Sequence, residues 1–265
     1  MRELTTVQAA YWVGRQSGQS MGGVASHIYA EFDGENIHSE QLAIAVTKLF
    51  QNHAMLRMKI TSDGQQAISP LSSFHQLMVD DIEHYSPKQT CEFLDQKRSV
   101  MTDQQLDVSN GQCAQISITR HSNGQFRLHI DVDMIAVDAK SFQILVEELA
   151  RLYTDGNYGD EISDGVPFFD YLDKQASDEY LDAKRKTDKK WWQTHLANVA
   201  DAPQFPYVSE SIDRQDGHSQ RFTHLFTCDE RISIESTAKQ HHLTTTQLFL
   251  TLFSQAIGST CQAPN

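Results

Sequence analysis

A strand that runs almost directly into a helix constrains the fold of this chain more than any other feature. From Ala139 to Tyr153, apolar residues recur at steps of three and four, which predicts a helix packed on a sheet. Just before it, residues 125–133 alternate apolar and polar side chains, the pattern of a half-buried strand, with the apolar positions at Phe126, Leu128, Ile130 and Val132. The short loop between them therefore lies at one end of a sheet.

This junction carries three polar side chains that can face a cleft, Asp133, Asp138 and Ser141. Asp138 is well placed as the N-cap of the helix, with Ser141 in its first turn, and many helices without any catalytic role begin in this way. Two roles therefore remain open for Asp138, that of a helix cap and that of a site residue. Capping does not account for Asp133, because a carboxylate among apolar residues is costly unless it is paired. We therefore expect Asp133 to have a partner.

The rest of the pattern predicts an α+β fold, a mostly antiparallel sheet covered by helices. Helices are predicted at residues 7–13, 39–51 and 87–100, and strands at 26–32, 55–60, 65–69 and 112–119, with a hairpin turn at Ser62-Asp63-Gly64. A linker at 155–166 precedes predicted helices at 168–176, 178–199, 229–240 and 244–257 and one strand at 221–228. We expect one lobe over residues 1–165, followed by linker helices and an incomplete second lobe over residues 166–265.

Charge and composition exclude several classes of function. The net charge of −13 argues against a nucleic-acid surface, and the basic cluster between Lys184 and Lys190 is predicted to be a solvated helix face. No apolar run approaches the roughly 20 residues that span a membrane, and no signal peptide is recognisable, so a cytoplasmic location is expected. The four scattered cysteines predict reduced thiols rather than a metal site. No phosphate-binding glycine motif is present.

Several segments together resemble the heterocyclization domains of nonribosomal peptide synthetases, which are relatives of condensation domains and of chloramphenicol acetyltransferase. Residues 4–15 are similar to the family's LTxxQxAYxxGR, and residues 133–141 fit DxxxxDxxS throughout. Residues 53–57 are similar to the RHxMLR segment, although Asn52 stands where arginine is usual and Met58 and Ile60 also depart. Weaker echoes lie at residues 203–206 and 243–246. The resemblance implies a chloramphenicol-acetyltransferase-like lobe and the start of a second lobe of the same type.

The resemblance implies a reaction that joins a carrier-bound acyl or peptidyl thioester to carrier-bound Cys, Ser or Thr and then expels water to give a thiazoline or oxazoline, often in siderophore biosynthesis. No cofactor is expected to bind directly. The substrates arrive on the phosphopantetheine arms of donor and acceptor carrier proteins, in a tunnel between the lobes, so catalysis relies on holding thioester and amine together. The implied partners are those carrier proteins and the adjacent synthetase domains or a complementary C-terminal lobe, with no nucleic acid and no membrane.

A comparison with ordinary condensation domains sharpens this expectation. Those domains carry HHxxxDG at this loop, and alignment of its aspartate on Asp138 places the second histidine at Met134, which cannot accept a proton. His129 is interpreted as a strand residue rather than a base. A stand-alone acetyltransferase is disfavoured for the same reason.

The site residues that the resemblance implies are Asp133, Asp138 and Ser141, with structural support from Arg57 and His53. Our hypothesis makes Asp138 mainly architectural, buried and paired with a basic group such as Arg57, and leaves Asp133 and Ser141 to shape the polar floor of the site. A second hypothesis from another class is an inactive or auxiliary fragment that only docks carrier proteins or a complementary lobe.

Overall fold

The computed structural model describes residues 1–16, 22–70, 74, 76–155, 166–205 and 222–261. The chain divides into two compact units, Met1–Asp178 and Glu179–Asn265, which are described separately. Helix α5 (Phe168–Ala176) belongs to the first unit, where Arg2 forms an ion pair with Asp173 and lies 5.2 Å above the Phe169 ring. The predicted division into lobes at residues 165 and 166 stays a prediction.

A four-stranded sheet forms the centre of the first unit, in the order β2-β7-β6-β5. The strands are β2 (His27–Glu35), β5 (Met78–Asp81), β6 (Ala114–Arg120) and β7 (Gln125–Asp133). All neighbours are antiparallel except β5 and β6, so the predicted, mostly antiparallel sheet is confirmed. Strand β7 has the predicted bounds, and the short 3₁₀ turn η3 (Ser122–Gly124) joins it to β6. Strand β5 was not predicted, because its four residues show no alternation of apolar and polar side chains.

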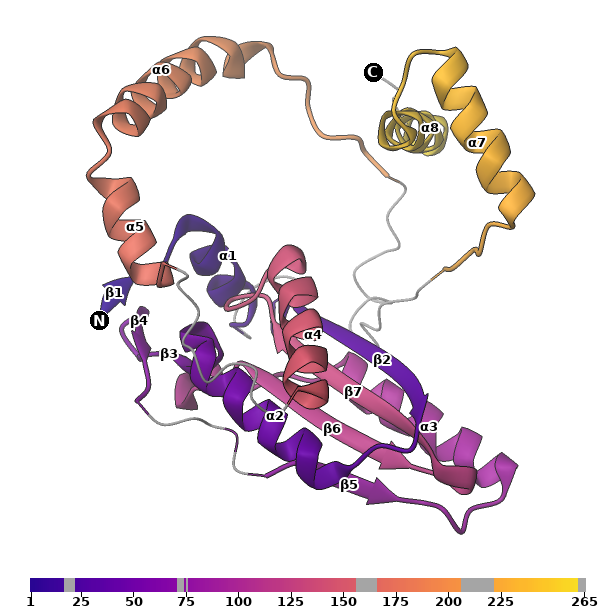
Figure 1. Cartoon of the computed structure of the whole chain (residues 1–265). Helices are drawn as coiled ribbons and strands as arrows, with labels where there is room; N and C mark the ends of the chain where they lie inside the picture. The colour runs from indigo at the N-terminus through magenta and orange to yellow at the C-terminus, as the bar shows by residue number, and fades with distance from the viewer. Residues whose placement is uncertain (17–21, 71–73, 75, 156–165, 206–221, 262–265) are drawn as a thin grey trace, which may run out of the picture. The chain divides into compact units, whose positions relative to one another are not determined.

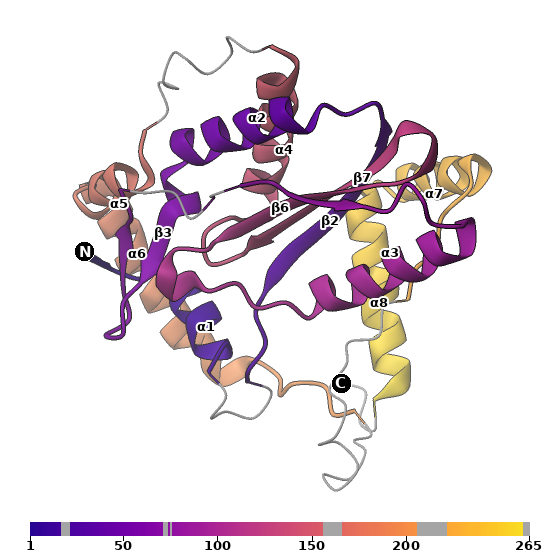
Figure 2. The same ribbon diagram turned by 90° about the horizontal axis from the view of Figure 1, so that it is seen from below.

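Helices cover both faces of this sheet. Helices α2 (Ser39–Asn52) and α4 (Ala139–Thr154) lie on one face, and α3 (Pro87–Thr102) lies on the other (Figures 1 and 2). All three helices were predicted, α4 from its apolar periodicity, and Ser86 caps α3 with a capping box. The main apolar core lies between the sheet and the first two helices, and its buried members include Val46, Leu49, Ile118, Ile130, Val132, Leu145 and Leu149.

A second, smaller sheet lies near the N-terminus, in the order β1-β4-β3. It consists of β1 (Arg2–Glu3), β3 (Met58–Ile60) and β4 (Gln65–Ile68), and helix α1 (Thr6–Gly14) follows β1. The β3–β4 hairpin is confirmed, and Gly64 adopts the positive φ of 76° that its turn requires. The predicted strand at 55–60 begins too early, because Ala54–Arg57 form the 3₁₀ turn η1. A further 3₁₀ turn, η2 (Val108–Asn110), leads into β6.

The second unit is helical in the residues that the structure describes. It contains α6 (Glu179–His195), η4 (Leu196–Asn198), α7 (Cys228–Gln240) and α8 (Thr245–Thr260). Residues 222–227 form no strand, because no described strand lies beside them to supply hydrogen bonds; residue 221 lies outside the described residues. The basic cluster of α6 is exposed, as predicted. Of the helices described, none is long and apolar enough to cross a membrane.

Candidate functional site

The loop between β7 and α4 is fixed to the rest of the first unit by its backbone. The N–H of Met134 donates to the carbonyl of Ser26 at 2.9 Å, and the N–H groups of Ala136 and Val137 both donate to the carbonyl of Asp133 at 3.1 Å. These bonds bend the chain tightly where the strand ends. The loop therefore presents one defined conformation before the helix begins at Ala139.

Asp133 has the partner that the sequence requires, and that partner is Arg15. The two side chains form an ion pair in which Asp133 is only 1% and Arg15 only 8% exposed. The second oxygen of Asp133 accepts the N–H of Ile135 at 3.0 Å, and Arg15 also donates to the carbonyl of Leu106. Burial raises the pKa of the Asp133 carboxyl, against the opposing effects of the Ile135 N–H and of Arg15. Asp133 is thus a buried anchor of the loop.

A second side chain of α1 holds the middle of the loop. The amide of Gln8 donates to the carbonyl of Ile135 at 3.0 Å and to the side-chain oxygen of Gln66 at 3.1 Å. Gln8 lies in α1 and Arg15 caps its C-terminal end. Because the two residues are seven apart, which is about two helical turns, their side chains lie on the same face. The sequence motif at residues 4–15 contained both residues, but their contact with the loop was not predicted. The one feature that could have indicated this contact is a glutamine within a short, mainly apolar helix, because such a side chain needs a hydrogen-bond partner when it is buried.

Asp138 is exposed and caps α4. Its carboxylate accepts the N–H of Ser141 at 2.7 Å, and the hydrogen bonds from the Ser141 backbone and hydroxyl lower the pKa of Asp138. The predicted ion pair between Asp138 and Arg57 is wrong. Arg57 donates instead to the carbonyls of Phe50 at 3.0 Å and Ser69 at 2.6 Å. Asp133 is thus the buried and paired carboxylate of the loop. Asp138 is exposed, and Ser141 is partly exposed.

His53 connects the end of α2 to α4 rather than contacting the loop. Its Nε2 lies 2.8 Å from Oε2 of Glu148, and the side-chain amide of Asn52 donates to the other oxygen of the same carboxylate at 3.0 Å. Asn52, at the position where the family usually has arginine, therefore has a local role. His53 and Arg57 both stabilise the segment between α2 and β4, and their proposed support of the site stays a prediction.

Two histidines lie on the sheet face under α3, and neither has a free ring nitrogen. His129 is fully buried, with Nδ1 2.7 Å from the Tyr29 hydroxyl and Nε2 3.0 Å from the Thr119 hydroxyl. Burial lowers the pKa of His129 to about 4, so the ring is neutral at pH 7. Nδ1 of His27 lies 2.6 Å from a carboxylate oxygen of Asp131, and its Nε2 lies 2.9 Å from the carbonyl of Thr102. His129 is a structural strand residue, as interpreted from the sequence.

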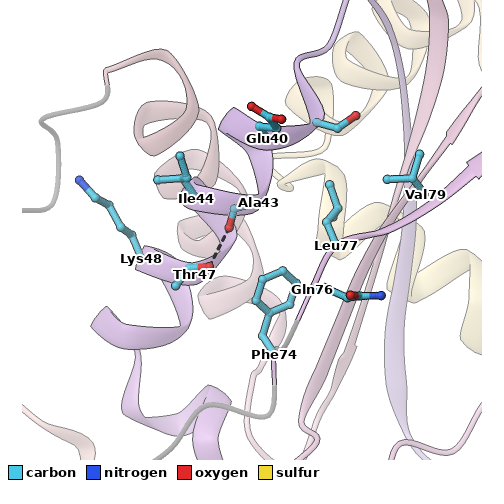
Figure 3. Close-up of a pocket in the computed structure, with 10 residues that line it drawn as sticks. Glu40, Ala43, Ile44, Thr47, Lys48, Phe74, Gln76, Leu77 and Val79 are labelled. Carbon is cyan, nitrogen blue, oxygen red and sulfur yellow. Dashed lines mark hydrogen bonds between the residues drawn. The ribbon is translucent and has the colours of Figure 1, made fainter.

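Neither the thiols nor the acidic groups form a metal centre in the part of the chain that the structure describes. All four cysteines are free, and burial raises the pKa of Cys113, whose thiol donates to the carbonyl of Met58 at 3.0 Å. A hollow with a volume of about 470 Å³ lies between α2 and β5, away from the loop (Figure 3). Its wall is mainly apolar, including Ala43, Ile44, Phe74, Leu77 and Val79.

Comparisons with known proteins add independent information to this geometry. The sequence profile of the condensation domain matches residues 1–264. The chain is 31% identical over 258 residues to phenyloxazoline synthase MbtB of Mycobacterium tuberculosis, covering 96% of this chain and 18% of that protein. It is 28% identical over 264 residues to pyochelin synthetase PchE of Pseudomonas aeruginosa, covering 97% of this chain and again 18% of the relative. The chain thus spans less than one fifth of either relative.

Solved structures show a similar fold. The EpoB cyclization-docking bidomain from Sorangium cellulosum matches with a TM-score of 0.80 at 23% identity, covering 99% of this chain and 52% of that one. The synthetase FmoA3 matches with a TM-score of 0.74 at 21% identity, covering 99% of this chain and 26% of that one. At this level of identity the likeness establishes the architecture alone.

Proposed function

Because the chain belongs to the condensation-domain family, we propose that it carries out heterocyclization in a nonribosomal peptide synthetase. A carrier-bound acyl or peptidyl thioester would be joined to carrier-bound Cys, Ser or Thr, and loss of water would close a thiazoline or oxazoline ring. The names of the two relatives, a phenyloxazoline synthase and a pyochelin synthetase, support this subtype and a product of the siderophore kind. Both substrates would be delivered on phosphopantetheine arms of carrier proteins.

The observation that carries the proposal is a loop without an available imidazole. Met134 is half-buried at the position where the resemblance places the histidine of ordinary condensation domains. The two histidines of the adjoining sheet face cannot replace it, because both ring nitrogens of His27 and of His129 are already hydrogen-bonded. General-base catalysis needs a free acceptor within reach of the substrate. The polar groups left at the loop are carboxylate and hydroxyl.

The geometry supports separate roles for the two carboxylates. Asp133 is buried against Arg15, so it would position the loop without touching the substrates. Asp138 is exposed, and its lowered pKa keeps it ionised at neutral pH, where it can accept a hydrogen bond from an amine or hydroxyl. The Ser141 hydroxyl lies beside it. We therefore assign the polar surface of the site to Asp138 and Ser141.

The test supplies a loaded donor carrier and a cysteinyl acceptor carrier and follows the acceptor by intact mass. The chain is used alone and together with a separately produced complementary lobe from a relative. The expected result is acyl transfer followed by loss of one water. Transfer without dehydration would reduce the proposal to simple condensation. Absence of both products, with either preparation, would contradict it and favour an auxiliary role in docking.

Two variants of Asp138 separate its charge from its role as a cap. Asp138→Asn retains an N-cap side chain but loses the charge, whereas Asp138→Ala loses both. If the carboxylate contacts the substrates, both variants lower turnover by a similar factor. If Asp138 only caps α4, the asparagine variant has normal turnover and the alanine variant is less stable.

A further inference from the structure

The hydrogen bonds of His27 define its charge. Its two partners, the Asp131 carboxylate and the carbonyl of Thr102, are both acceptors, at 2.6 and 2.9 Å. A neutral imidazole has one donor nitrogen and one acceptor nitrogen, and only the imidazolium donates from both. Thr102 is the last residue of α3, where carbonyl groups lack helical partners and a nearby cation is favoured. Both contacts, to Asp131 of β7 and to the end of α3, are therefore satisfied at once only when the His27 ring is protonated.

The segment after α3 contacts Arg15, the partner of Asp133. The Gln104 amide donates to the second carboxylate oxygen of Asp131 at 2.8 Å, which holds the chain just after the helix. Two residues later, the carbonyl of Leu106 accepts a hydrogen bond from Arg15, whose other nitrogen pairs with Asp133. A continuous set of contacts thus connects His27 to the loop before α4.

Helix α3 depends strongly on such polar contacts. Only Leu94 and Met101 of its 16 residues are buried, and its other connections to the sheet include ion pairs of Lys97 with Asp80 and of Arg98 with Glu31. An element with few buried apolar side chains opens at low free-energy cost. Loss of one polar contact at its C-terminal end should therefore loosen residues 102–105, which are largely exposed and lead to the buried Leu106.

We propose that His27 is a positioning residue whose protonated ring holds residues 102–106 against β7 and thereby keeps Arg15 in place on Asp133. Loss of the proton leaves the ring with one donor, so either the Asp131 or the Thr102 contact breaks. The inference concerns the free chain and does not rest on the proposed function.

The surroundings of His27 favour its cationic form. The hydrogen bond to Asp131 raises the pKa of His27 against the opposing effect of burial, and the charge of Asp133 adds to the rise. Because the pKa is raised in the folded protein, the stabilisation is fully present below the pKa of the unfolded chain. It is lost as the pH rises through the folded value. The charged groups that act on the His27 ring are Asp131 and Asp133 of β7, and Asp133 is itself paired with Arg15.

The first experiment measures the charge of His27 directly in the wild-type chain. Ring-nitrogen NMR should show two protonated nitrogens at about pH 7, where a histidine peptide is largely neutral. A neutral His27 ring at about pH 6 would overturn the proposal. This measurement needs no variant and remains informative if the substitutions below destabilise the fold.

The second experiment measures whether the charge controls the loop. Hydrogen exchange, corrected for intrinsic rates, is followed for residues 102–107 and for the amides of Ile135 and Val137 at about pH 6 and about pH 9, which bracket histidine titration. The wild-type chain should lose protection several-fold in both segments at the higher pH. His27→Gln, a neutral side chain, should be equally unprotected at both values, while the exposed control His38→Gln behaves as wild type. A pH step that persists in His27→Gln, or that spares residues 135–137, would contradict the positioning role.

Discussion

The two faces of the four-stranded sheet are both buried, but different interactions stabilise them. The face toward α2 and α4 is apolar, with Ile118, Ile130 and Val132 packed against leucines of both helices. On the face toward α3, His129 and Asp131 of the same strand are completely inaccessible and hydrogen-bonded. The alternation along β7 predicted a half-buried strand, and its second half is instead buried on both sides.

This difference changes what a substitution does on each face. Burial of apolar area is non-directional, so loss of a side chain on the apolar face costs in proportion to the area and the cavity left behind. On the polar face, removal of one partner leaves the other buried and unpaired, which costs more than the contact contributed. The polar face also connects to the loop at Asp133, so its contacts determine the conformation of the candidate site.

The largest effect is expected where the polar face meets the loop. Arg15→Ala leaves the Asp133 carboxylate buried without its cation and should lower the free energy of unfolding by about 3–5 kcal/mol. Arg2→Ala, which removes an ion pair with the exposed Asp173, is the matched control and should cost less than about 1 kcal/mol. Urea denaturation measures both. Equal losses in the two variants would show that the buried pair has no special weight.

A large but pH-independent effect is expected on the apolar face. Leu49→Ala, which opens a cavity between α2 and the sheet, should lower the free energy of unfolding by about 2–5 kcal/mol. Ile44→Ala, on the same helix at a residue that is 61% exposed, should change it by less than about 0.5 kcal/mol. The Leu49→Ala loss should be the same at about pH 5 and about pH 7, since no titrating group is involved. A loss that varied with pH would contradict the claim that only the polar face responds to titration.

The polar face should instead respond to acid through His129. Because burial lowers its pKa from 6.5 to about 4, the unfolded chain takes up a proton in this range before the folded chain does. The stabilisation by neutral His129 is therefore present above pH 6.5 and is lost as the pH falls toward 4. Denaturation of the wild type and of His129→Gln across this range isolates its contribution. The variant should show the shallower decline, and identical slopes would contradict the assignment of a neutral buried ring.

The smallest effect is expected at the exposed end of the loop. Asp138→Ala removes the N-cap of α4 and should cost about 1 kcal/mol, whereas Asp138→Asn should be close to neutral. Thermal unfolding of the two variants gives the comparison. A loss as large as that of Arg15→Ala would mean that Asp138, like Asp133, is anchored by a buried partner.

Much of the fold follows from local sequence patterns. The bounds of β7 and α5, the start of α2 and α4, the β3–β4 hairpin and the cap at Asp138 all depend on side chains a few residues apart. Periodicity, capping and turn chemistry act over that range, so they can be read directly from the chain. The motif at residues 133–141 likewise indicated where the polar loop would lie.

The tertiary structure alone decided which polar groups are buried and what they pair with. Arg15 meets Asp133 across 118 residues of sequence, and Gln8 meets Ile135 across 127. The sequence required a partner for Asp133 without identifying it. It suggested a pairing of Arg57 with Asp138, whereas Arg57 donates to backbone carbonyls. The same limit explains the unpredicted β5 and the missing strand at 222–227, since a strand depends on a neighbour that is distant in sequence. Local propensity fixes the elements, whereas burial and pairing depend on how those elements pack.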